Sequence, residues 1–253
     1  MKKLLVATLL LTLASCGGSS YQKSALDVII QGLDQEKNFT IILFDMNVEG
    51  SLSKDYFHKY KIVKEGKGEE DLPKEEITEW YKVSENEFDI HVNDLGMEVA
   101  SKKDGVLSKN VAPPGYSNYV GNSRYGQWRS DNSGNSFWSF YGKYAFMSSM
   151  MGLVSGPVYR NSYSDWNSNY RTSSRPYYGR TIGGVSSYGT ASTAARKQNP
   201  TFYNRAQTNS ALKSTVNNKV SRSPSTASRV SRSSSRYSSG SSTKSRSMSR
   251  GGK

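Results

Sequence analysis

The chain has 253 residues, of which only 35% are apolar, and its formal net charge is +13. Residues 21–110 contain twelve Lys against nineteen Asp and Glu, whereas residues 111–253 contain twenty Lys and Arg against two Asp. This asymmetry indicates an acidic folded part followed by a basic interaction tail. Cys16 is the only cysteine, which excludes an internal disulfide.

The first twenty residues contain the most specific pattern in the chain. Lys2 and Lys3 precede an apolar run over 4–13, and small residues then lead to a cysteine. This layout is typical of a secretory signal peptide, and the apolar run is too short to span a bilayer comfortably. Leu13-Ala14-Ser15-Cys16 closely resembles the lipobox of bacterial lipoproteins.

The lipobox resemblance implies cleavage before Cys16, diacylation of that cysteine and acylation of its new amino group. Residues 1–15 are then a lipoprotein signal peptide, and residues 16–23 are the lipidated cysteine and a short tether. Gly17 is not the aspartate associated with inner-membrane retention. The resemblance therefore implies the outer membrane in a bacterium with two membranes, and the outer leaflet where there is one. The alternatives are an ordinary signal peptide with a chance cysteine, or a short N-terminal anchor.

Residues 24–110 predict a small acidic α+β domain with one helix and a mostly antiparallel sheet. Ser24, with Asp27 three places on, forms a weak capping box that starts a helix over 24–36. Alternating apolar residues and β-formers indicate the sheet, whose strands we place at 39–48, 56–63, 79–83 and 88–92. Asp104-Gly105 is a further hairpin turn signal.

Residues 111–156 form a Tyr/Gly/Asn-rich segment followed by an aromatic and methionine-rich one. Over 136–156, helical spacing brings Phe137, Tyr141 and Tyr144 near one stripe, which indicates a helix. We favour packing on the domain or contact with a partner. The second reading places this segment in the membrane interface, and the third has it cross the membrane, against which Lys143 argues.

Residues 157–253 predict a basic Ser/Arg/Tyr-rich disordered tail, in which Ser-Arg repeats begin at Ser221. This composition buries too little apolar surface to offset the entropy cost of ordering. Arginine offers fork-shaped donors for phosphate and carboxylate groups. We assign polyanion binding to six arginines of the tail, namely Arg222, Arg229, Arg232, Arg236, Arg246 and Arg250. A solvated spacer is the alternative interpretation of the tail.

The sequence shows no recognisable catalytic motif, cofactor site or metal site. His58 lies on the apolar side of its predicted strand, so a partly buried, hydrogen-bonded histidine is favoured over a catalytic one. His91 lies on the polar side of its predicted strand, and we expect it to be solvated. The mature part of the chain resembles no family of known function.

The predicted function is a non-enzymatic structural or binding role in the cell envelope. Lipid on Cys16 holds the chain at the membrane, and the basic tail contacts anionic lipids or acidic envelope polymers. The signal peptide argues against nucleic acid as the partner, and no protein partner is identified. One alternative is a nucleic-acid-binding protein acting through the Ser/Arg tail. The other is an accessory subunit of an envelope hydrolase, which requires His58 in a cleft with a carboxylate and a hydroxyl.

Overall fold

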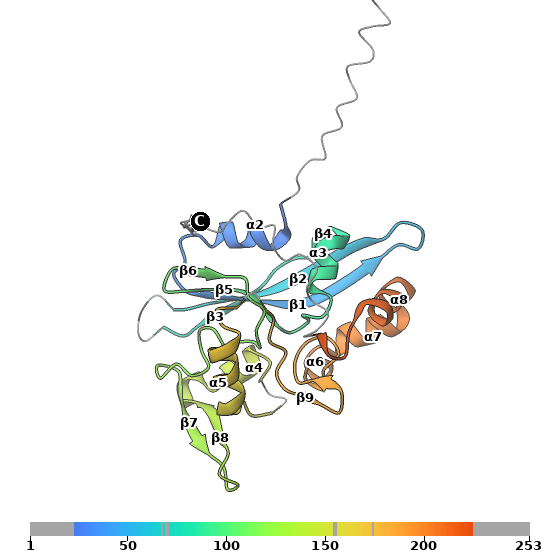
Figure 1. Cartoon of the computed structure of the whole chain (residues 1–253). Helices are drawn as coiled ribbons and strands as arrows, with labels where there is room; N and C mark the ends of the chain where they lie inside the picture. Colours follow the sequence, from blue (N-terminus) through green and yellow to red (C-terminus); the bar gives the residue numbers. More distant parts are fainter. Residues whose placement is uncertain (1–22, 67, 69–70, 154–155, 174, 225–253) are drawn as a thin grey trace, which may run out of the picture.

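The computed structural model describes residues 23–66, 68, 71–153, 156–173 and 175–224 (Figure 1). Seven α-helices and a mostly antiparallel sheet lie within these residues, so the predicted α+β class is confirmed. None of the described helices is both long enough and apolar enough to cross a membrane.

The main sheet has six strands, and every pairing in it is antiparallel. Its strands follow the order β3-β2-β1-β5-β6, with β4 also paired to β2. Their bounds are β1 (Phe39–Glu49), β2 (Asp55–Lys64), β3 (Lys74–Ile77), β4 (Tyr81–Val83), β5 (Glu98–Lys103) and β6 (Val106–Ser108). The predicted strands at 39–48 and 56–63 are therefore confirmed, and β1 is central, as its apolar run indicates.

Two helices that lie between or before the strands in sequence pack against this sheet. The first is α2 (Ala25–Gly32), and the Ser24 hydroxyl caps it by accepting a hydrogen bond from the Asp27 amide at 3.0 Å, as predicted. The second is α3 (Glu85–His91). The strand predicted at 88–92 is therefore wrong, because residues 88–91 belong to this helix. The Ser84 hydroxyl caps α3 through the Glu87 amide, and this cap selects the helix in a segment whose apolar residues fit both periods.

Residues 126–153 and 156–169 form a second layer below the sheet in Figure 1. Its elements are β7 (Gly126–Ser130), β8 (Ser136–Phe140), the 3₁₀ turn η1 (Gly142–Tyr144), α4 (Met147–Met150) and α5 (Arg160–Asn169). The helix predicted within 136–156 is wrong for its first part, because residues 136–140 pair with β7 and join Trp138 to Trp128 across the strands. Packing on the domain is confirmed, since Met147 and Met151 share a buried cluster with Ile42 of β1.

The prediction of a disordered tail is wrong for residues 157–173 and 175–224. Besides α5, this part contains β9 (Thr181–Ile182), β10 (Val185–Ser186), α6 (Thr193–Gln198), α7 (Pro200–Thr208) and α8 (Ser210–Lys219). Phe202 and Leu212 are fully buried in the same core cluster as β1. The average composition does not reveal these few apolar residues, which are stabilised by packing in the core of the sheet. Residues 225–253 of the predicted tail lie outside the described residues.

Candidate anion-binding site

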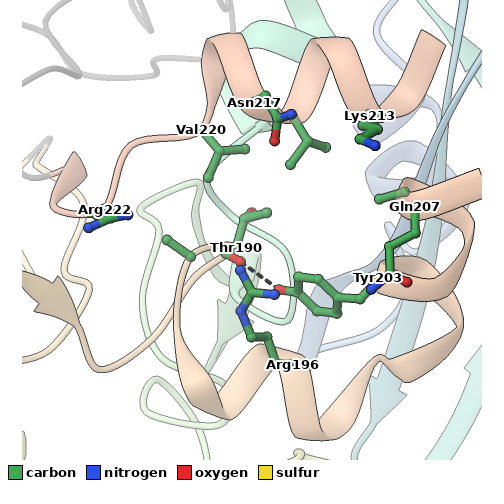
Figure 2. A pocket seen from close by; sticks show the side chains of 11 residues that line it. Thr190, Arg196, Tyr203, Gln207, Lys213, Asn217, Val220 and Arg222 are labelled. Carbon is green, nitrogen blue, oxygen red and sulfur yellow. Dashed lines mark hydrogen bonds between the residues drawn. The ribbon is translucent and has the colours of Figure 1, made fainter. Parts of the chain in front are cut away.

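An open pocket of about 350 Å³ lies between α6, α7 and α8, beside the segments at residues 190–191 and 220–222 (Figure 2). Three cationic residues line it, namely Arg196, Lys213 and Arg222, together with the amides of Gln207 and Asn217. No aspartate or glutamate is among the described residues that line it. The pocket therefore combines concavity with a single sign of charge, which concentrates counter-ions.

Local capping fixes the helices that form the pocket. The Ser192 hydroxyl accepts from the Ala195 amide at 3.0 Å and starts α6, and Pro200 occupies the first turn of α7. The Asn209 side chain caps α8 by accepting from the Leu212 amide at 3.1 Å, and its amide donates to the Val48 carbonyl of β1 at 2.8 Å. One side chain thus starts α8 and ties it to the sheet.

The wall opposite α8 is anchored through Thr190. Its carbonyl accepts a hydrogen bond of 2.5 Å from the Tyr203 hydroxyl, and its hydroxyl donates to the Val92 carbonyl at 2.7 Å. The preceding Gly189 has φ +87°, and a Cβ there would lie 2.5 Å from the Asn93 carbonyl oxygen. Only glycine allows this approach, so the pocket wall is joined to the segment between α3 and β5.

The three cations of the pocket form no ion pair with a carboxylate of the described chain. The Arg196 guanidinium instead lies over the Tyr203 ring, 4.8 Å from its centroid. Ion pairs are formed by other cations of this part of the chain, namely Lys61, Lys64, Lys82, Lys102, Lys109, Arg124, Arg205 and Lys219. Other described cations, such as Arg129, Arg160 and Lys197, also form no ion pair with a described carboxylate. The pocket differs from them because it brings three such cations to one cavity, which is suited to an anion.

Of the six arginines assigned to polyanion binding, Arg222 lies in this pocket. The other five, and the predicted lipidation site Cys16, lie outside the described residues. Sequence reasoning missed Arg196 and Lys213, because the segment that contains them was assigned to a disordered tail. One feature of the sequence pointed to these residues, because no Asp or Glu follows Asp165. Every later cation therefore lacks a nearby acid in the sequence.

The two histidines lie away from the pocket. His58 is fully buried, and its Nδ1 lies 3.0 Å from the Tyr60 hydroxyl, whereas Nε2 has no hydrogen-bond partner among the described residues. Burial, with a smaller contribution from His91, lowers the pKa of His58 well below 6.5, so the ring is neutral. His58 is thus enclosed in the core rather than placed in a cleft, and the arrangement required for a hydrolase site is not formed there.

The expectation that His91 is solvated is wrong. The residue is buried at the end of α3, and its Nδ1 lies 2.8 Å from a carboxylate oxygen of Asp94. The other oxygen of Asp94 accepts a hydrogen bond of 2.5 Å from the Tyr178 hydroxyl. The helical course of residues 85–91 turns His91 inward, where it joins the sheet domain to the later part of the chain.

Glu98 of β5 is a buried carboxyl group that does not line the pocket. It is fully buried, and one carboxyl oxygen accepts a hydrogen bond from the Ser117 hydroxyl, while the other finds no partner in the described part of the chain. Burial raises its pKa from 4.5 to about 7, although hydrogen bonds from Ser117 and Ser101 oppose the shift. Glu98 therefore makes the stability of the fold dependent on pH.

Comparison with known proteins adds no relative, because no family model, curated protein or solved structure matches the chain.

Among the described residues, no group of three or more His, Cys, Asp and Glu side chains could hold a metal ion.

Proposed function

We propose that this chain is a lipid-anchored protein of the bacterial cell envelope with a non-enzymatic binding role. Its basic C-terminal region contacts an anionic component of the envelope, and the pocket between α6, α7 and α8 receives an anionic group of that component. The single observation behind this proposal is the convergence of three cations on one cavity, where the described residues supply neither an ion-pair partner for them nor an acid in the lining.

The lipobox resemblance at Cys16 supports the location. Residues 16–23 are eight residues long, and an extended chain spans at most roughly 3.5 Å per residue. Lipidation of Cys16 would therefore keep Ser24 and α2 within about 28 Å of the bilayer. At that distance the basic region meets lipid phosphates and acidic envelope polymers before other polyanions. The lipid on Cys16 makes the membrane a direct partner of the chain.

The test compares two variants that lose the same charge. The first replaces the pocket cations by Gln (Arg196→Gln, Lys213→Gln, Arg222→Gln), and the control replaces Arg129, Arg160 and Lys197, which are exposed and do not line the pocket. Both are made in the full chain with Cys16→Ala, and binding of fluorescently labelled polyphosphate is measured by anisotropy at low and physiological salt.

The expected result is a loss of affinity of at least tenfold in the pocket variant and a smaller loss in the control. Binding of polyphosphate to the chain with the unaltered pocket should weaken as salt is added. Dissolved ions screen exposed charges, with a screening length of roughly 10 Å at 0.1 M. Equal losses in the two variants would show that net charge alone attracts the polymer. That result would remove the pocket from the proposed function.

A further inference from the structure

We propose that the ligand of this pocket is an amphipathic organic phosphate, in which a phosphate monoester carries an apolar substituent. The inference rests on the proposed function, because it concerns the same three cations. It adds the chemical nature of the substituent that carries the anionic group. This nature follows from the apolar residues of the pocket lining.

Apolar side chains form part of the pocket lining beside the polar and cationic ones. Ala191, Ala206, Val216 and Val220 line it together with the ring of Tyr203, and all five are only partly buried. Four of them, excluding Ala191, pack against the buried core cluster of the sheet and helices. An inorganic ion would leave these side chains in contact with water, whereas an apolar substituent would cover them.

The dimensions agree with an organic ligand. The cavity of about 350 Å³ lies within the roughly 300–1,000 Å³ typical of small-molecule sites. One water molecule takes a share of about 30 Å³ in the liquid, so a bare phosphate ion would occupy only part of the space. The remaining volume matches a substituent of several carbon atoms.

Cationic and apolar side chains are interleaved around the pocket. Figure 2 shows Lys213 and Arg222 on opposite sides of the pocket, with Arg196 beside Tyr203 between them and Val220 facing the interior. The Tyr203 hydroxyl is already donated to Thr190, so its ring offers an apolar edge rather than a free donor. A phosphate of charge about −1.5 to −2 matches three cations better than a carboxylate does.

The experiment measures binding of inorganic phosphate, hexyl phosphate and hexanoate to the full chain with Cys16→Ala by isothermal titration calorimetry. Each methylene that becomes buried improves affinity by about fourfold, so three or four of them predict binding of hexyl phosphate about 100-fold tighter than that of phosphate. Hexanoate should bind more weakly than hexyl phosphate, because it has one negative charge.

Two variants separate the parts of the argument. Val216→Thr with Val220→Thr keeps the side-chain shape but adds hydroxyls, and it should reduce the preference for hexyl phosphate about tenfold while leaving phosphate binding unchanged. Arg196→Gln with Lys213→Gln should weaken all three ligands. Thermal unfolding of each variant verifies that it is folded.

Three outcomes would contradict the proposals in different ways. Equal affinity for phosphate and hexyl phosphate would overturn the amphipathic ligand while the proposed anion site stands. Hexanoate binding as tightly as hexyl phosphate would overturn the phosphate assignment. Binding of every ligand that is unaffected by Arg196→Gln with Lys213→Gln would overturn the proposed function itself.

Discussion

Replacing Glu98 by Gln should remove about 3 kcal/mol of pH-dependent stability from this protein. The folded-state pKa is about 7 against an ordinary value of 4.5, and each pKa unit corresponds to about 1.4 kcal/mol. Because the folded-state pKa is raised, the folded protein keeps a proton that the unfolded chain has released. Its contribution to stability is complete below about pH 4.5, falls as the pH rises and is lost above about pH 7.

Urea unfolding followed by tryptophan fluorescence at pH 4.5, 6 and 8 tests this reasoning. The free energy of unfolding of Glu98→Gln relative to the unaltered chain should rise by about 3 kcal/mol between pH 4.5 and pH 8. The matched control is Glu76→Gln, because the Glu76 side chain is 61% exposed in its pair with Lys64. Burial also raises the pKa of Glu87 and of Asp45, but both remain in the variant. Identical pH profiles for Glu98→Gln and the unaltered chain would refute the assignment.

Three further predictions concern the anchor, the folded C-terminal region and the tail. Cys16→Ala should abolish labelling by a fatty-acid analogue, and undiminished labelling would contradict the lipobox interpretation. Phe202→Ala should lower the free energy of unfolding by about 3–5 kcal/mol, because Phe202 is fully buried in the main core; a loss below about 1 kcal/mol would mean that α7 is not part of the cooperative fold. Replacing the six predicted arginines by Ser should weaken binding to polyphosphate and reduce its salt dependence, measured by anisotropy, while circular dichroism stays unchanged; those arginines are Arg222, Arg229, Arg232, Arg236, Arg246 and Arg250.

The sequence predicted the elements that have strong local signals. The cap at Ser24, the apolar run of β1 and the Asp104-Gly105 turn lead directly to the observed helix, central strand and hairpin. Residues 88–92 fit a strand and a helix equally well by period, and the hydrogen bond from the Glu87 amide to Ser84 decides for the helix. Periodicity alone cannot resolve so short a segment.

For the candidate site, the sequence predicted the positive charge but not the pocket. Composition correctly marked the late part of the chain as basic, and Arg222 was among the predicted ligand-binding residues. The pocket itself depends on contacts distant in sequence, such as the Asn209 amide with the Val48 carbonyl and the Arg205 guanidinium with Asp45. Composition does not report such contacts, so a sparse set of apolar residues such as Phe202 and Leu212 appeared insufficient for folding.

The docking of α7 and α8 on β1 has a consequence for the order in which this chain can fold. Arg205 and Asp45 are separated by 160 residues, and Asn209 and Val48 by 161. During synthesis, β1 is therefore complete long before the helices that cover its end exist. Until α7 and α8 are made, the sheet exposes apolar side chains that these helices later cover. Such exposure favours aggregation, and the long sequence separation slows folding. Any chain that stops before Leu212 lacks a buried part of its own core, so truncation inside the basic region should produce an aggregation-prone protein rather than a shorter soluble one.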